Sequence, residues 1–203
     1  MRCSTTRRHG WDDPAVAPVP APLRLYRTAV RPEWVDYNGH MSEWCYLLVM
    51  GDSSDAFFRY LGIDDDYRAA GASLYTVETH IRNLREVSEG EELCLTLQVL
   101  GVDAKRVHVA HEIVAAPTSA VDGPTAGGGG LIATGEQMLL HVDARVGKAS
   151  PLPAPLLGRL QRIAEAHSVL SWPDWVGHVM RIPPHRDGAA HPTDEAGATW
   201  TSS

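Results

Sequence analysis

The sequence predicts an α+β domain in which an antiparallel sheet curls around one long apolar helix. Three observations lead to this class: a short strand candidate at 23–30, an apolar helix candidate at 42–61, and four consecutive strand candidates between 74 and 142. A sheet and a helix in this order bury each other's apolar faces, which favours a two-layer architecture. The 203 residues are enough for one domain with a sizeable core.

Composition narrows the class of protein. Hydrophobic residues make up 44% of the chain and charged residues 21%, which is typical of a soluble globular domain. No apolar run reaches the ~18 residues of a membrane span, and the basic start of the chain lacks the apolar stretch of a secretory signal. A net charge of −7 argues against nucleic-acid binding. The three cysteines lack metal-ligand spacing and look like reduced thiols, so we expect a cytoplasmic protein without a metal or membrane partner.

The chain divides into one ordered part and two loose ends. Residues 1–22 are rich in proline and small side chains and are predicted to be disordered. Residues 23–170 form the predicted domain, and 171–203 a C-terminal extension that we expect to be largely loose. The Gly-rich stretch 117–130 is typical of a flexible insertion in a hairpin loop.

The first predicted elements are a strand at Leu23–Val30 and a helix at 42–61. The Ser42 side chain can cap the helix, and Gly62 can provide its left-handed stop. The stretch WCYLLVM is apolar on all sides, so we expect the helix to be wrapped by other structure.

The second half of the domain is predicted to be a series of antiparallel strands and a final helix. In the second strand candidate, alternate residues from Leu93 to Val99 share an apolar face. Short Gly-containing links suit hairpins, and on a strand His108 and His111 point to opposite faces. The apolar spacing over 153–168 predicts a helix. The four strands are expected at Leu74–Leu84, Leu93–Val102, Arg106–Ala115 and Leu131–Val142.

The most informative motif is Asp36-Tyr-Asn-Gly-His-Met-Ser42, which directly precedes the predicted helix. Helix N–H groups can polarise a carbonyl oxygen while a neighbouring carboxylate attacks the carbonyl carbon or activates water. The same arrangement also suits a carboxylate that simply satisfies a helix start.

The order of elements, together with D-x-x-G-H at Asp36, Gly39 and His40, resembles the hotdog fold of acyl-CoA thioesterases of the 4-hydroxybenzoyl-CoA thioesterase-like group. The resemblance covers about residues 23–170 and includes the runs TVETHIRNLREVSEGEEL and EQMLLHVD. The runs VRPEWVDYNGHM and DAKRVHVAHE are similar to betainyl-CoA thioesterases of carnitine breakdown.

This resemblance implies hydrolysis of a small acyl-CoA, most of all betainyl-CoA, without a cofactor other than the coenzyme A of the substrate. Two alternatives stay open: a thioesterase for another acyl-CoA or acyl-carrier-protein substrate, and a non-catalytic acyl-CoA-binding module. The resemblance also implies an active site between subunits, hence a homodimer or a dimer of dimers, and subunit pairing would cover an exposed sheet edge.

The resemblance assigns Asp36 as nucleophile or general base. Gly39 would allow close approach of the thioester or a positive φ, and His40 would orient Asp36 or the turn backbone. The backbone N–H groups near Ser42 and Glu43 are the expected oxyanion donors. Family members usually carry Asn where this chain has Ser42, so the donors of that amide are lost.

Substrate contacts are expected from basic and aromatic side chains. Lys105 and Arg106 suit the phosphates of coenzyme A, unless they form a solvated turn, and Arg82 is an alternative. Rings next to the motif suit a cage for the trimethylammonium of a betainyl group; for Trp44 we expect a packing role instead. Glu78 and Glu136 are either site residues or solvent-facing. The ring candidates are Trp34, Tyr37, Trp44 and Tyr46.

Overall fold

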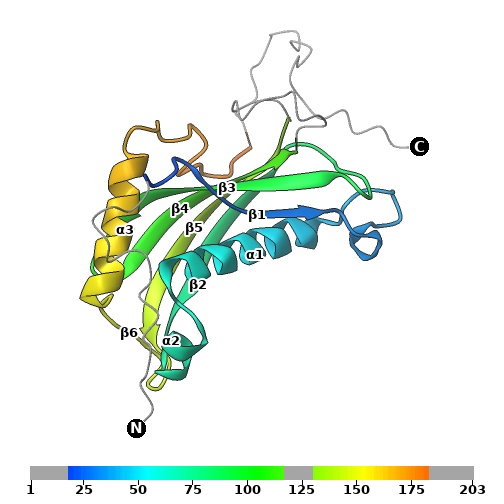
Figure 1. Ribbon diagram of the computed structural model, residues 1–203. Helices are drawn as coiled ribbons and strands as arrows, with labels where there is room; N and C mark the ends of the chain where they lie inside the picture. Colours follow the sequence, from blue (N-terminus) through cyan, green and yellow to red (C-terminus); the bar gives the residue numbers. More distant parts are fainter. Residues whose placement is uncertain (1–17, 117–129, 183–203) are drawn as a thin grey trace.

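The computed structural model of the protein describes residues 18–116 and 130–182. Most of the segment predicted to be disordered and nearly all of the predicted Gly-rich insertion lie outside the described residues. In the described part, the predicted series of strand, helix, four strands and helix is confirmed (Figure 1).

The sheet is antiparallel throughout, with the strand order β1-β3-β4-β5-β2 and a short β6 paired to β5. Long strands with hairpin connections explain the β3-β4-β5 order, whereas β1 and β2 reach the two edges because α1 separates them along the chain. The elements are β1 Leu23–Ala29, the 3-10 helix η2 Pro32–Trp34, α1 Glu43–Leu61, α2 Asp65–Ala69, β2 Ala72–Asn83, β3 Glu92–Val102, β4 Arg106–Ala115, β5 Leu131–Asp143, β6 Lys148–Ala149 and α3 Ala154–His167.

The ends of α1 follow partly from the predicted caps. Gly62 stops the helix in the left-handed region, with φ +83°, as predicted. Ser42 occupies the N-cap position, but its side chain makes no capping hydrogen bond, so that prediction was wrong. The helix is also not wrapped on all sides. Trp44, Leu47 and Leu48 are exposed by 59%, 48% and 37%.

The core between α1 and the sheet consists of two apolar halves. We call the half near the start of α1 the proximal half; it includes Trp34, Met41, Cys45, Val49, Met50 and Val87. The distal half surrounds the end of α1 and includes Phe57, Leu61, Leu156, Leu160 and Ile163. Figure 1 shows α3 beside the end of the sheet where α1 ends, which is why α3 contributes only to the distal half.

A buried polar layer lies between these halves. The Ser54 hydroxyl, on α1, donates to Gln137 Oε1 on β5 at 3.0 Å and lies 3.4 Å from His111 Nε2 on β4. Complete burial lowers the pKa of His111 to about 4, although the hydrogen bond with Gln137 acts in the opposite direction. The histidine is therefore neutral in the folded protein at physiological pH.

The segment after α3 crosses the outer face of the sheet. It meets β3, β4, β5 and β2 in turn, so the part of the C-terminal extension that the structure describes is tied down by side-chain contacts. Glu136 accepts a hydrogen bond from the Gly177 amide at 2.7 Å and contacts His108, so it is not an ordinary solvent-facing glutamate. The four contacts are Gln98–Ser171, His108–Trp172, Glu136–Gly177 and His80–His178.

No helix within residues 18–116 and 130–182 has the length and apolar character that a membrane crossing requires.

Candidate active site

Asp36 lies at the start of a tight backbone hairpin. Val35 and Met41 form an antiparallel bridge, and the Asp36 N–H donates to the His40 carbonyl at 2.9 Å. Gly39 turns the chain with φ +82°, a conformation that residues with a Cβ rarely adopt. Apart from Gly39 and its two chain neighbours, no atom of the described residues lies within 4 Å of the position of a Gly39 Cβ. The turn therefore requires glycine for its backbone conformation and not for close packing.

The Asp36 carboxylate is held by one of its oxygens. Oδ1 accepts the Asn38 N–H at 2.8 Å. Within the part of the chain that the structure describes, Oδ2 has no hydrogen-bond partner. The side chain is partly exposed. One oxygen thus orients the carboxylate while the other is left without a described partner, as a nucleophile or base requires.

The start of α1 follows directly and offers free N–H groups. The Ser42 N–H is already used, because it donates to the Trp34 carbonyl at 2.8 Å, and the Cys45 N–H donates to the Ser42 carbonyl. Among the described residues, no acceptor pairs with the N–H of Glu43 or of Trp44. The expectation that the Ser42 amide is an oxyanion donor is therefore corrected, and the available donors begin at Glu43.

His40 contacts the neighbouring turn and not the Asp36 carboxylate. Its Nδ1 lies 3.3 Å from Glu86 Oε2, and its backbone forms a bridge with Ser88. The next amide along the chain, that of Met41, donates to the Val87 carbonyl at 2.8 Å. These contacts agree better with the second predicted role of His40, orientation of the turn backbone, which stays a prediction.

The four aromatic candidates divide into two buried and two exposed rings. Trp34 is only 3% exposed, and the Arg31 guanidinium already lies over its ring. Tyr46 is buried, its hydroxyl donates to the Arg85 carbonyl at 3.3 Å, and burial raises its pKa. Tyr37 and Trp44 are exposed by 96% and 59%. The prediction that Trp44 packs the helix against the sheet is therefore wrong for a single chain.

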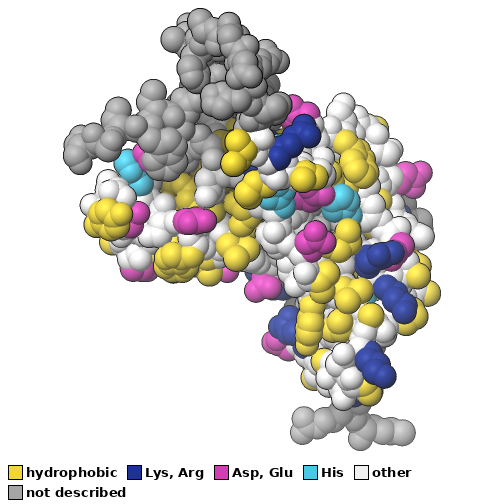
Figure 2. Space-filling view, turned by 180° about the vertical axis from the view of Figure 1, so that it is seen from behind, with side chains coloured by type: hydrophobic (Ala, Val, Ile, Leu, Met, Phe, Trp, Pro, Cys, Tyr) yellow, Lys and Arg dark blue, Asp and Glu magenta, His cyan; other side chains and the backbone are white. Residues whose placement is uncertain are grey.

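The predicted phosphate-binding pair lies far from Asp36. Lys105 and Arg106 belong to the hairpin after β3, whereas the Asp36 hairpin contacts the turn before β3. The 11 residues of β3 span roughly 36 Å at about 3.3 Å each, so the two ends are well separated. Figure 2 shows Lys and Arg side chains gathered mainly toward the side of the molecule that holds α3 and β6 in Figure 1.

The basic hairpin is partly neutralised by its own carboxylate. The N–H groups of Lys105 and Arg106 and the Arg106 guanidinium all donate to Asp103, and they lower its pKa to about 2. Lys105 is therefore the more available cation of the pair. Arg82, in contrast, lies near the end of β2 that leads into the turn before β3, which is the Asp36 end of the sheet.

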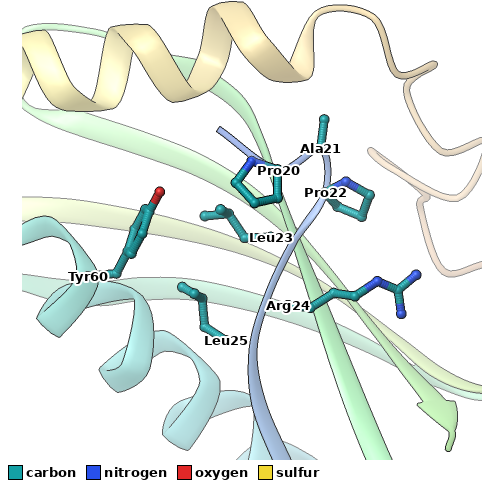
Figure 3. Close-up of a pocket in the computed structure, with 7 residues that line it drawn as sticks. All are labelled: Pro20, Ala21, Pro22, Leu23, Arg24, Leu25 and Tyr60. Atoms are coloured by element: carbon teal, nitrogen blue, oxygen red, sulfur yellow. The ribbon is translucent and has the colours of Figure 1, made fainter. Parts of the chain in front are cut away.

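Two pockets in the described structure lie away from Asp36. One, of about 370 Å³, is formed by the basic hairpin together with Leu140. The other, of about 390 Å³, lies where the N-terminal segment meets the end of α1, and Figure 3 shows Tyr60 directed toward Pro20 and Leu23 across it. Asp36 lines neither of these two pockets. No group of three or more His, Cys, Asp or Glu within the described residues is arranged to bind a metal ion.

The sequence interpretation missed the turn at 84–91, which contacts both the Asp36 hairpin and α1. The only signal was its match to the family run, together with the spacing of Ser88 and Glu91 by three residues. In the structure the Glu91 carboxylate accepts the Ser88 N–H at 2.8 Å and contacts Arg85 at 3.0 Å.

Sequence comparison places this geometry in a family. The profile of the thioesterase-like superfamily matches residues 30–160. The L-carnitine dehydrogenase/betainyl-CoA thioesterase of Rhizobium meliloti is 49% identical over 156 residues, which are 77% of this chain and 29% of that protein. The betainyl-CoA thioesterase of Pseudomonas aeruginosa is 41% identical over 165 residues, which are 81% of this chain and 98% of that protein. The chain thus spans about three tenths of the fused relatives.

Comparison with solved structures agrees with the sequence comparison. A candidate thioesterase of Pseudomonas putida KT2440 has a TM-score of 0.66 and 35% identity, covering 81% of this chain and 99% of that one. A hypothetical protein of Staphylococcus aureus, solved in complex with CoA, has a TM-score of 0.67 and 21% identity, covering 82% and 100%. The predicted hotdog fold is confirmed. With the carboxylate hairpin ahead of a helix start inside the matched region, the chain belongs to the thioesterase-like superfamily.

Proposed function

We propose that this protein hydrolyses a small acyl-CoA thioester, betainyl-CoA above all, to the free acid and coenzyme A. The observation that carries the proposal is the Asp36 carboxylate, which has one oxygen without a partner among the described residues. It lies in the hairpin that directly precedes the start of α1, where the N–H groups of Glu43 and Trp44 have no described acceptor either. The names of the relatives support the choice of acyl group, since the Pseudomonas aeruginosa protein, matched over nearly its whole length, is a betainyl-CoA thioesterase.

In this proposal the thioester carbonyl oxygen accepts hydrogen bonds from the Glu43 and Trp44 N–H groups. These donors stabilise the negative charge that develops on the oxygen, and the positive end of the α1 dipole adds to the effect. Asp36 either attacks the carbonyl carbon, giving an anhydride that water then opens, or removes a proton from the attacking water. By either route the C–S bond breaks, the acyl carbon gains hydroxyl, and the sulfur leaves as the thiol of coenzyme A. The proposal requires no cofactor beyond the coenzyme A of the substrate.

The acyl group is proposed to meet Tyr37 and Trp44. Of the four predicted cage residues, only these two present free ring surface next to Asp36. An aromatic face attracts a quaternary ammonium through its quadrupole. The proposed cage therefore consists of Tyr37 and Trp44, and the buried Trp34 and Tyr46 are left out of it.

We also propose that the site is completed by a second copy of the chain. β2 is an edge strand, and its residues 75–79 are all exposed. The exposed apolar face of α1, with Trp44, Leu47 and Leu48, belongs to the helix that contacts β2. Unpaired strand edges next to apolar surface are prone to pair with another chain. A dimer, or a dimer of dimers, would cover both surfaces.

Such a dimer also gives the basic hairpin a role. Two β2 strands that pair antiparallel about a twofold axis place the start of one β2 beside the end of the other. The start of β2 and the Lys105 hairpin are at the same end of the sheet, since Ala72 pairs with Asp143 and Arg106 with Leu140. Lys105 of one subunit would then lie at the Asp36 end of its partner, where coenzyme A phosphates can reach it.

The proposal is tested by thiol release from a panel of betainyl-, acetyl-, hexanoyl- and 4-hydroxybenzoyl-CoA. We expect the highest kcat/KM with betainyl-CoA. A preference for another acyl-CoA would replace the acyl assignment and keep the hydrolase. Tight binding of betainyl-CoA without thiol release would favour the non-catalytic binding module instead.

A further inference from the structure

We propose that Glu91, Arg85 and Tyr46 are positioning residues, which set the distance between the Asp36 hairpin and the start of α1 through the turn at 84–91. The inference rests on the proposed hydrolysis at Asp36. None of the three side chains needs to touch the substrate for this role.

The Glu91 carboxylate holds the shape of the turn. One of its oxygens accepts the Ser88 N–H at 2.8 Å, and the other accepts from the Arg85 guanidinium at 3.0 Å. The backbone on either side of the turn is anchored as well, because Val30 donates to the Glu91 carbonyl and accepts from Gly90, both at 2.9 Å. A single carboxylate therefore ties both ends of the turn together beside the end of β1.

One side of the turn supports the hairpin that carries Asp36. The Met41 N–H donates to the Val87 carbonyl at 2.8 Å, and His40 and Ser88 form an antiparallel bridge. Val87 is fully buried in the proximal half, so the turn cannot shift without moving core side chains. Any displacement of the backbone at Ser88 is passed directly to the strand of the hairpin that follows Gly39.

The other side of the turn holds the first turns of α1. The Tyr46 hydroxyl donates to the Arg85 carbonyl at 3.3 Å, and the side chain of Tyr46 is buried in the proximal half. Arg85 thus contacts Glu91 through its guanidinium and α1 through its carbonyl. The carboxylate and the helix amides, which must both reach one thioester, are fixed to the same short turn.

This arrangement predicts an effect on turnover more than on binding. A misplacement of about 1 Å between reacting groups can cost on the order of 100-fold in rate, even when the substituted residue is remote. We expect Glu91→Ala to lower kcat about 10- to 100-fold with KM changed less than about threefold. The matched control is Glu89→Ala, because Glu89 is an exposed acidic residue of the same turn without a side-chain partner among the described residues.

Two further measurements separate positioning from loss of folding or of the proposed function. Tyr46→Phe removes only the hydroxyl bond to the Arg85 carbonyl and should also lower kcat. Amide hydrogen exchange of the Met41 N–H should be faster in Glu91→Ala than in wild type or Glu89→Ala, whether or not the protein hydrolyses any thioester. In the Asp36→Asn variant, the further substitution Glu91→Ala should lower the residual kcat less than about twofold. The reason is that Glu91 is proposed to act by positioning Asp36, and the effects of residues that act through one group do not add.

The proposal is overturned if Glu91→Ala and Tyr46→Phe both keep the kcat of Glu89→Ala, or if Glu91→Ala raises KM at constant kcat, which would make it a binding residue. Unchanged Met41 exchange would overturn it independently of activity. If wild type releases no thiol but Glu91→Ala still speeds Met41 exchange, the proposed function fails. The link from Glu91 to the Asp36 hairpin is then supported independently.

Discussion

The distal and proximal halves of the core differ in how they are covered, although they share one helix and one sheet. The distal half is closed: α3 covers it, and its largest side chains, such as Phe57 and Leu160, are completely buried. The proximal half is equally well packed inside, but the outer surface of α1 beside it exposes Trp44 and Leu47. Between them lies the polar layer of Ser54, His111 and Gln137.

The difference between the two halves predicts which residues contribute to stability alone and which also contribute to catalysis. Among the described residues, the distal half includes none from the Asp36 hairpin. The proximal half, in contrast, includes Met41 of that hairpin, whose N–H donates to the Val87 carbonyl. We therefore expect changes in the distal half to alter folding alone, and changes in the proximal half to alter folding and turnover together.

The largest expected effect compares one buried residue from each half. Leu160→Ala should lower the free energy of unfolding by about 3 kcal/mol, the cost of deleting a buried leucine, with kcat unchanged where the protein is folded. Val87→Ala should cost less, about 2 kcal/mol, yet lower kcat about tenfold. Urea unfolding and steady-state kinetics on both variants make the comparison. Equal losses of kcat would erase the distinction between the halves.

A second prediction concerns the polar layer that divides them. Because burial holds the pKa of His111 at about 4 in the folded protein, compared with 6.5 when unfolded, the unfolded chain binds the extra proton first as pH falls. Stability should be fully present above pH 6.5 and should decline down to about pH 4, by roughly 3 kcal/mol in total.

His167, whose pKa burial also lowers, contributes in the same direction. The measurement is the free energy of unfolding against pH for wild type and His111→Gln. The variant should show a clearly shallower decline over this window. An identical decline in both proteins would show that His111 is not the group responsible.

The open surface next to the proximal half is tested by blocking the edge of β2. Val77→Lys places a charge on the exposed edge and should weaken the dimer about 100-fold in Kd. Light scattering should then give the 22.1 kDa of one chain where wild type gives twice that mass. Val169→Lys, at another exposed apolar residue, serves as the control. A wild-type protein that is already monomeric at micromolar concentration would contradict the dimer.

The smallest expected effect concerns the exposed rings. Tyr37→Leu and Trp44→Leu should each raise KM for betainyl-CoA about tenfold and leave KM for acetyl-CoA nearly unchanged, since only the former carries a cation. Trp172→Leu, which removes an exposed ring on the outer face of the sheet, is the matched control. Equal changes for both substrates would rule out the cage.

Sequence reasoning predicted the elements well because their signals are local. Alternation identified β3, and Gly62 marked the end of α1. It also placed Asp36 and Gly39 in one short turn ahead of the helix, and the role of the Asp36 carboxylate stays a prediction. Signals that depend on tertiary contacts failed. The apolar stretch of α1 could not reveal which side stays open, and the Ser42 amide was engaged by a carbonyl that only the fold brings near.

Sequence reasoning also could not predict how far apart two motifs lie in the fold. Nothing in the sequence indicated that Lys105 and Asp36 lie at opposite ends of β3, since the strand order has to be known first. The partly exposed Glu91 gave only a faint signal, because its proposed importance lies in a turn that contacts both the Asp36 hairpin and α1.

The most direct test of the central claim is to measure kcat for betainyl-CoA and the Kd for free coenzyme A in wild type and Asp36→Asn. The substitution keeps the shape of the side chain and its acceptor for the Asn38 N–H, but it removes the charge. We predict a loss of at least about 1,000-fold in kcat with an unchanged Kd, because only the reacting group is altered. A variant that keeps wild-type turnover would contradict the assignment and make Asp36 a structural carboxylate of the hairpin.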